Sequence, residues 1–168
     1  MGDWDCRVDR NYQTRNLGCR ATISNAINEF FGMYEDGIIL EDDCLPSETF
    51  FQFCQAMLER FRLDERVMQI NGTYYLGETF PIKKSYYFSK INSCWGWATW
   101  RRAWEKNDFC LTDYIENRKK GMIERYYGDS EIARWMNFHF EDALKPYCKV
   151  WSTAWAYSIM KHDGLCVN

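Results

Sequence analysis

Three carboxylates follow directly on a short apolar run in the stretch Gly37-Ile38-Ile39-Leu40-Glu41-Asp42-Asp43-Cys44-Leu45-Pro46-Ser47. An uninterrupted apolar run of this length, bounded by a proline, is typical of a strand buried on both faces, as in a parallel sheet. The acids would then lie at the carboxyl edge of that sheet, where open α/β folds bind their ligands. The stretch therefore predicts a ligand site at the end of a strand.

The acidic triplet itself points to a metal. Adjacent carboxylates repel one another, so Glu41, Asp42 and Asp43 require a counter-charge in a folded protein. Hard oxygen ligands favour Mg²⁺ or Mn²⁺, and these ions usually keep several waters and share the phosphates of a substrate. We therefore expect a metal–diphosphate site here. The alternative interpretation is a solvated acidic turn that precedes a helix capped by Ser47.

Hydrophobic spacing predicts an α/β chain around this stretch, and the 168 residues suffice for one domain over 1–168. We expect helices over residues 20–31, 48–62, 112–120, 130–144 and 151–162, and strands over 37–40, 67–71 and 86–88, with another beginning at 165. Residues 6–12 alternate loosely and indicate a further strand. Strand, helix and strand would then form the βαβ unit of a parallel sheet.

A glycine between two indoles, in Trp95-Gly96-Trp97, indicates a second part of the binding site. Glycine lets the backbone approach a ligand closely, and indole rings pack on the apolar C–H face of sugars. We therefore expect Trp95, Gly96 and Trp97 to contact a substrate. Residues 97, 100 and 104 fall on one face if this segment is helical, and for Trp100 and Trp104 plain core packing is an equal alternative.

Composition limits the partners. The net charge of −3 provides no basic footprint for nucleic acid. No apolar run approaches the roughly 20 residues that a membrane-spanning helix needs. The eight cysteines form no Cys-x-x-Cys pair and the two histidines have no fitting spacing, which argues against a zinc site. The apolar context of most cysteines favours reduced, buried thiols in a cytosolic protein.

Taken together, these segments resemble the bacterial glycosyltransferases of the nucleotide-diphospho-sugar transferase (GT-A) fold. More narrowly, the chain is similar to a family-2-like group sometimes labelled haemolytic-protein-like. The resemblance covers nearly the whole chain, in the family's order, and is carried by Asn16-Leu17-Gly18-Cys19, residues 37–47, Phe50-Phe51, Tyr86-Tyr87-Phe88-Ser89, residues 95–104, and Trp151 with Trp155. It implies a three-layer α/β/α domain with a mixed, mainly parallel sheet, in a cytoplasmic or membrane-peripheral protein.

The resemblance also implies an activity, the transfer of a sugar from a nucleotide-sugar donor to a saccharide or other hydroxyl acceptor. It assigns Asp43 as a ligand of Mn²⁺ or Mg²⁺, Asp42 to the ribose or to the metal and its water shell, and Glu41 to the donor sugar. The divalent ion would neutralise the charge that develops on the leaving diphosphate.

The base that takes the acceptor proton is less clear from the resemblance. Family members carry an acid after the first tryptophan of the final helix, where this chain has Ser152. Asp142 is the substitute candidate, by loose analogy with the Glu-Asp motif of family-2 enzymes, and Asp108 is a weaker one. For Asp142 a solvated helix end is the alternative interpretation.

A second departure concerns the start of the chain. Family members usually begin with another βαβ segment that holds the nucleotide base, and this chain is expected to start after it. Donor affinity would then be impaired, and the incomplete sheet would expose an edge that invites two copies to pair. These departures leave a non-catalytic sugar- or nucleotide-binding module open as an alternative. A nucleotidyltransferase would need a glycine- and lysine-rich loop after its first strand, and the sequence has none.

Overall fold

A computed structural model describes residues 5–74, 84–128, 130–148 and 150–168 of the chain. In chain order its elements are α1 (Cys19–Met33), β1 (Asp36–Ile39), α2 (Glu48–Arg60), β2 (Val67–Asn71), β3 (Phe88–Ser89), β4 (Trp97–Trp100), α3 (Arg101–Trp104), α4 (Tyr114–Lys119), α5 (Met122–Tyr127), α6 (Ser130–Ala143), α7 (Ser152–Lys161) and β5 (Leu165–Val167). The expected α/β chain is confirmed.

The strands form one mixed sheet in the order β1-β4-β2-β5-β3. Strand β4 runs antiparallel to both β1 and β2, β3 runs antiparallel to β5, and β2 and β5 are parallel. The expectation of a mainly parallel sheet is therefore wrong for the described strands. The physical reason is that β4 lies between β1 and β2 and returns beside each of them in the opposite direction. A parallel neighbour would require a crossover connection.

Strand β1 lies at one end of this sheet. Its Ile38 pairs with Ala98 of β4, and all of its residues are half-buried. The sequence-based expectation of a strand buried on both faces is therefore wrong, because among the described residues only β4 pairs with it. Residues 6–12 form no strand and are exposed. Strand β1 is thus a sheet edge, and the pairing of two copies there stays a prediction.

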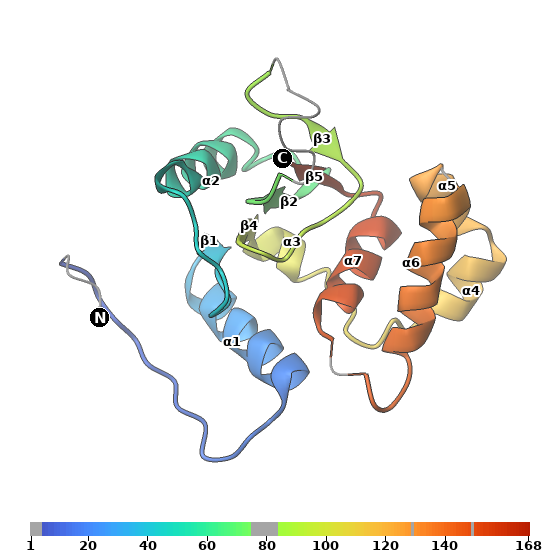
Figure 1. Cartoon of the computed structure of the whole chain (residues 1–168), viewed down its shortest axis with the longest axis horizontal. Coiled ribbons are helices and arrows are strands. Elements are labelled where there is room, and N and C mark those ends of the chain that lie inside the picture. The colour runs from blue at the N-terminus through green and yellow to red at the C-terminus, as the bar shows by residue number, and fades with distance from the viewer. Residues whose placement is uncertain (1–4, 75–83, 129, 149) are drawn as a thin grey trace.

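Helices cover both faces of the sheet (Figure 1). On one face α2 packs Phe50, Cys54 and Leu58 against Ile70 and Trp100. On the other face α1, α3 and α7 contribute a second cluster of buried side chains, which comprises Ile27, Phe31, Trp104, Trp155 and Ile159 with Met68 and Trp97 of the strands. Helices α4, α5 and α6 pack against the outer side of α7 through a third cluster.

The tryptophan-rich segment departs from expectation. Residues 97–100 form the strand β4, followed by the single helical turn α3, so the predicted common helical face is wrong. Side chains alternate along a strand, which sends Trp97 toward α7 and Trp100 toward α2. Pairing with β1 and β2 on both sides satisfies the backbone of β4, and this tertiary requirement outweighs the helical spacing of the indoles.

All eight cysteines are free thiols, but only Cys54 and Cys166 are buried. The expectation of mostly buried thiols is therefore wrong, since Cys6, Cys19 and Cys110 are exposed. The two buried thiols lie within α2 and β5, whereas Cys6 and Cys19 have polar or glycine neighbours. Within the described ranges no helix has the length and apolar character needed to cross a membrane.

Candidate functional site

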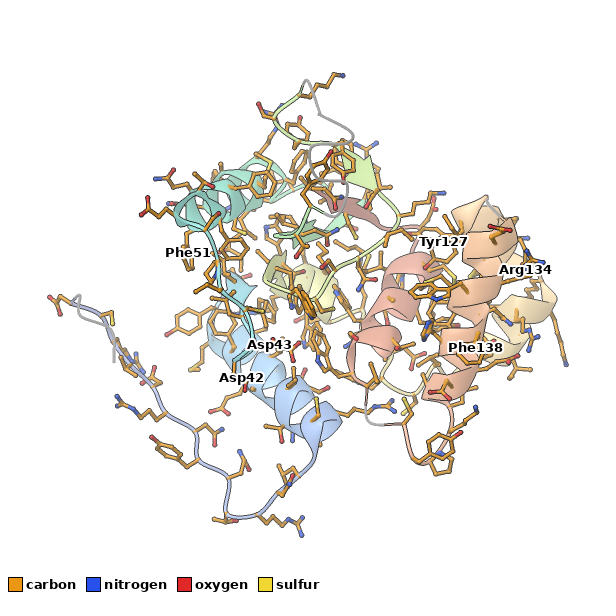
Figure 2. All side chains as sticks on the ribbon, in the orientation of Figure 1. Asp42, Asp43, Phe51, Tyr127, Arg134 and Phe138 are labelled. Carbon is orange, nitrogen blue, oxygen red and sulfur yellow. The ribbon has the colours of Figure 1, made fainter. Side chains whose placement is uncertain are left out.

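The acidic triplet lies on the loop between β1 and α2, as expected from its place after the apolar run. A hydrogen bond from the backbone N–H of Cys44 to the carbonyl of Glu41 closes a turn at 3.1 Å. Asp42 and Asp43 are exposed, whereas Glu41 is half-buried. Figure 2 shows Asp42 and Asp43 beside one another at this turn. The loop thus presents two carboxylates to solvent and holds one against the fold.

Asp43 borders a cavity of about 330 Å³, here called the Asp43 cavity. Trp95 and Gly96 line the same cavity, together with Phe50 of α2 and the loop residue Thr73 that follows β2. The structure therefore brings three of the sequence-predicted site residues together around one hollow, at the end of β1 and the start of β4.

Two glycines allow the walls of the Asp43 cavity to approach. The backbone N–H of Gly72 donates a 2.8 Å hydrogen bond to the carbonyl of Gly96. A Cβ atom on Gly72 would lie 2.5 Å from that carbonyl oxygen and 2.1 Å from the ring of Phe50. Gly96 adopts a φ of +66°, a conformation that other residues rarely take. The expected close approach of backbone at Gly96 is present, but its partner is the protein itself.

The two indoles that flank Gly96 have opposite environments. The side chain of Trp95 is 66% exposed, and its carbonyl accepts a 2.7 Å hydrogen bond from the hydroxyl of Thr73. Trp97 is fully buried and stacks on Trp151, with ring centroids 5.7 Å apart. The expected substrate contact of Trp97 is therefore not supported, because strand alternation directs this ring into the core. Trp95 remains available to a ligand.

Glu41 is electrostatically unlike its two neighbours. Burial raises its pKa, the nearby carboxylates of Asp43 and Asp42 raise it further, and a hydrogen bond with Trp151 opposes them. Together with Asp42 it lines a separate hollow of about 270 Å³ against the Thr22 side of α1. The triplet is thus divided, with Asp43 on one hollow and Glu41 and Asp42 on the other.

The carboxylates do not by themselves enclose a cation. Among the described residues no three His, Cys, Asp or Glu side chains are grouped so that they could hold a metal ion. Mg²⁺ and related ions are commonly held by one or two carboxylates, with waters and substrate phosphates completing the shell. The adjacent, exposed Asp42 and Asp43 fit that second kind of site, which forms only together with a phosphorylated ligand.

Asp142 lies in a different cavity of about 380 Å³, here called the Asp142 cavity. Trp95 lines this cavity as well, and so do His139 and Ser152. The Asp142 carboxylate pairs with the ammonium of Lys145 at 2.9 Å, close to the end of α6. Asp142 therefore matches both sequence-based interpretations, since it is a charged residue at a helix end and it faces a hollow shared with Trp95.

Ser152 lies close to the triplet as well as to the Asp142 cavity. The thiol of Cys94 has a pKa raised to about 12 by burial and by the carboxylate of Glu41, and hydrogen bonds from Ser152 and Asn92 partly offset this. A serine thus occupies the position where the resembled enzymes carry an acid, between Glu41 and the Asp142 cavity.

Thr73 and His139 are among the residues of these cavities that sequence reasoning missed. Thr73 carries no motif and reaches the site only because β2 ends beside Gly96. The signal for His139 was present, because residues 135, 139 and 142 share one face of a helix. Its ring contacts Trp135 at a centroid distance of 4.3 Å. Trp135 itself is 59% exposed, so this helix face borders solvent and the Asp142 cavity.

Comparisons with models of known protein families, with curated proteins and with solved structures find no match. The resemblance to GT-A glycosyltransferases therefore rests on the sequence blocks named above and stays a prediction.

Proposed function

We propose that this chain is a metal-dependent glycosyltransferase domain, which transfers a sugar from a nucleotide-diphospho-sugar to an acceptor hydroxyl. The observation that carries the proposal is the position of Trp95, which lines both the Asp43 cavity and the Asp142 cavity. A sugar ring packed on this exposed indole would have a carboxylate able to bind a metal on one side and a carboxylate able to take a proton on the other.

Each residue then has a distinct role. Asp43 and Asp42 hold Mn²⁺ or Mg²⁺ together with the donor diphosphate, and the bound ion supplies the positive charge that stabilises the leaving group. Glu41 interacts with Trp151 and lines the separate hollow against α1, so its assignment to the donor sugar rests on the resemblance alone. Asp142 takes the proton of the acceptor hydroxyl, while Lys145 holds its carboxylate in place.

A non-catalytic sugar- or nucleotide-binding module is the second candidate. Two observations favour it: Ser152 replaces the acid of the resembled enzymes, and no protein-only metal group exists among the described residues. Such a module would use the Asp43 cavity and the face of Trp95 for binding alone. It would bind saccharides or nucleotides without cleaving a donor.

The first prediction concerns Asp43. Addition of MnCl₂ with UDP or GDP is expected to raise the melting temperature, whereas either component alone has little effect. Ligand at 100 times its Kd stabilises by about 2.7 kcal/mol, which corresponds to roughly 5–10 °C for a chain of this size. Asp43→Ala is expected to abolish the shift, because the ion loses a ligand. Differential scanning fluorimetry measures both results.

Two controls separate a site from general charge effects. Glu48→Gln removes an exposed acid at the start of α2, outside the three hollows described above, and the shift should persist in it. Trp95→Ala should leave the unliganded melting temperature nearly unchanged but reduce binding of the complete nucleotide-sugar more than binding of UDP. An unchanged melting temperature of the wild type with all tested nucleotides would count against the proposal.

Donor hydrolysis distinguishes the two candidates. Release of UDP from UDP-glucose or UDP-N-acetylglucosamine, dependent on MnCl₂ and lost in Asp43→Ala, would support a transferase and exclude the binding module. Calorimetric binding of the same donors without measurable release would support the module instead. Asp142→Asn should lower transfer to an acceptor without weakening the MnCl₂–UDP shift, since it is assigned to the acceptor side.

A further inference from the structure

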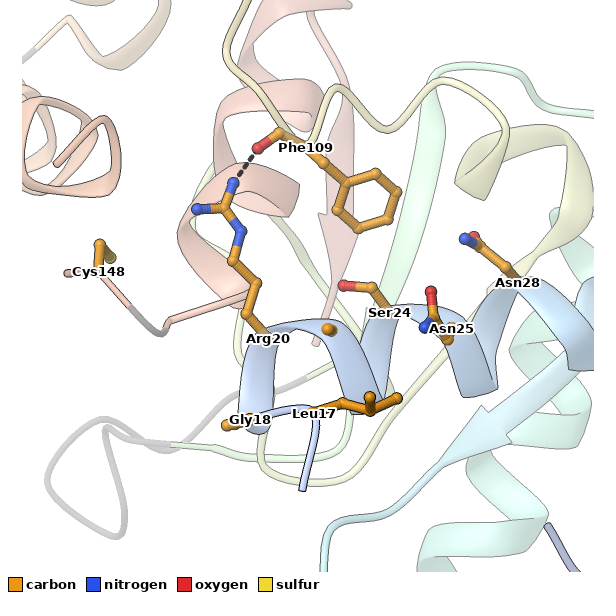
Figure 3. A pocket seen from close by; sticks show the side chains of 10 residues that line it. Leu17, Gly18, Arg20, Ser24, Asn25, Asn28, Phe109 and Cys148 are labelled. Carbon is orange, nitrogen blue, oxygen red and sulfur yellow. Dashed lines mark hydrogen bonds between the residues drawn. The ribbon is translucent and has the colours of Figure 1, made fainter. Parts of the chain in front are cut away.

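A cavity of about 430 Å³ lies on the side of α1 opposite the hollow of Glu41 and Asp42, and we call it the Arg20 cavity. It is bordered by the first turns of α1 and by Phe109 and Cys148 from distant parts of the chain. Figure 3 shows Arg20 and Ser24 directed from α1 toward the side where Phe109 lies. None of the glycosyltransferase residues proposed above borders this cavity, so its ligand is a separate question.

The hydroxyl of Ser24 is the first indication of a ligand. Ser24 is 7% exposed, and its Oγ atom has no hydrogen-bond partner within the described part of the chain. Buried polar groups are nearly always paired, because an unpaired one loses its hydration without compensation. A hydroxyl that is buried, unpaired and directed into a cavity is therefore suited to a molecule bound there.

The remaining polar groups of the cavity are mostly donors. The guanidinium of Arg20 donates to the carbonyls of Phe109 and Ala143, which uses two of its five N–H groups. The Oδ1 atom of Asn28 accepts a 2.7 Å hydrogen bond from Trp104, so its other amide group is a donor. No Asp or Glu of the described ranges lines the cavity. The environment therefore favours a ligand that carries acceptor atoms and negative charge.

The backbone of α1 adds to this preference. The helix has 15 residues, no acidic residue in its first turn and no side-chain cap at Gly18. The free N–H groups and the dipole of a helix start favour anions. Gly18 and Cys19 at this start line the same cavity as Arg20 and Ser24. The N–H of Gly18 donates a 2.8 Å hydrogen bond to the side chain of Asn16, so the backbone donors available to a ligand begin at Cys19. Donors from the backbone and from side chains thus converge on one volume.

The other walls are apolar, formed by Leu17, Ala21 and the ring of Phe109. A volume of about 430 Å³ is in the range of small-molecule sites. We propose that the Arg20 cavity binds a small organic anion, a carboxylate or a phosphate monoester with an apolar group. Its charged oxygens lie at Arg20 and Ser24, and its apolar group lies against Phe109.

Binding of benzoate and phenyl phosphate to the full chain tests the proposal, with benzyl alcohol as the neutral probe. Titrations followed by ¹H–¹⁵N NMR should show shifts at residues 18–28 and 109 for the two anions. The alcohol should bind at least tenfold more weakly, because it carries no charge. The anion that binds more tightly assigns the class as carboxylate or phosphate ester. Equal binding of all three probes, or no binding of either anion, would overturn the proposal.

Two variants locate the ligand. Ser24→Ala should weaken anion binding about fivefold, the effect of one hydrogen bond, and should leave the unliganded chain at least as stable, because it removes an unpaired hydroxyl. Ala21→Phe adds a ring at an exposed position of the cavity wall and should weaken binding by tenfold or more. Thr22→Ala, on the opposite side of α1, is the matched control. Unchanged affinity in both cavity variants would show that the anions bind elsewhere and would refute the assignment.

Discussion

Two acidic clusters in this chain differ in how their charge is compensated. Asp108 and Asp113 both pair with Lys161 of α7, at 3.4 and 2.9 Å. Asp108 also accepts hydrogen bonds from Thr112, and Asp113 accepts one of 2.6 Å from Tyr157. The charges of this cluster are therefore compensated within the protein. Asp108 joins the 108–113 loop to α7, and this structural role argues against Asp108 as the catalytic base.

The triplet at residues 41–43 forms no ion pair with a lysine or arginine of the described ranges. Among the residues that the structure describes, no lysine or arginine lines the Asp43 cavity or the hollow of Glu41 and Asp42. The pKa values of Asp108 and Glu41 are shifted in opposite directions. Burial alone raises the pKa of Asp108, but hydrogen bonds from Thr112 and Lys161 outweigh it and lower the value, whereas the pKa of Glu41 is raised. Within the described residues, the chain thus neutralises one acidic cluster internally and not the other, and a cation at the second cluster stays a prediction.

The largest effect is expected from removing the internal cation. Lys161→Met keeps the apolar stem but leaves Asp108 and Asp113 without their counter-charge. The free energy of unfolding should fall by about 2 kcal/mol, below the ~3–5 kcal/mol of a fully buried pair because the cluster is partly exposed. Urea unfolding followed by tryptophan fluorescence measures the loss.

An exposed pair supplies the control for this variant. Lys120 and Glu116 pair at 2.6 Å with both side chains more than half exposed. Lys120→Met should therefore change stability by less than about 0.5 kcal/mol. If Lys161→Met costs no more than Lys120→Met, the Asp108–Asp113 cluster is not a structural ion pair and the contrast with residues 41–43 fails.

An effect of intermediate size on the free energy of unfolding is expected when the pH is lowered. The pKa of Asp108 is lowered from its ordinary value of 3.8 in the folded state. A lowered pKa contributes stability that is present above the unfolded-state value and is lost as the pH falls through the folded-state value. Unfolding free energies measured between pH 6 and pH 3 should therefore decline less in Asp108→Asn than in wild type, with the difference appearing below about pH 4. An equal decline would show that other acids carry the pH dependence.

The sequence predicted the elements of the fold better than their arrangement. The amphipathic spacing of residues 20–31 and 48–62 located α1 and α2 within a few residues, because one apolar face of a helix is a local property. The neighbours of β1 were not predictable, since strand order depends on pairings between distant residues such as Ile38 and Ala98. The exposure of β1 on one edge follows from that order.

In the candidate site, too, local features were predictable from the sequence and contacts between distant residues were not. The position of Asp43 beside Trp95 and Gly96 agrees with their expected convergence. The burial of Trp97 could not be inferred, because a short aromatic run fits a helix or a strand until its partners are known. The internal pairing of Asp108 with Lys161 joins residues 53 positions apart, and no local pattern marks it.

The smallest effect is expected at Glu41, and its sign is opposite to that of Asp108. A carboxyl group whose pKa is raised on folding lowers stability as the pH rises above its ordinary value of 4.5. Glu41→Gln should therefore stabilise the metal-free chain at pH 7 by a few tenths of a kcal/mol, an estimate typical of partly exposed charges. The gain should vanish near pH 4, where Glu41 is protonated in wild type. With MnCl₂ and UDP bound, the added cation compensates the triplet, so the variant should lose its advantage at pH 7. A gain that persists at pH 4 or with ligand would show that the substitution acts through packing, and the charge contrast between the two clusters would then lack this support.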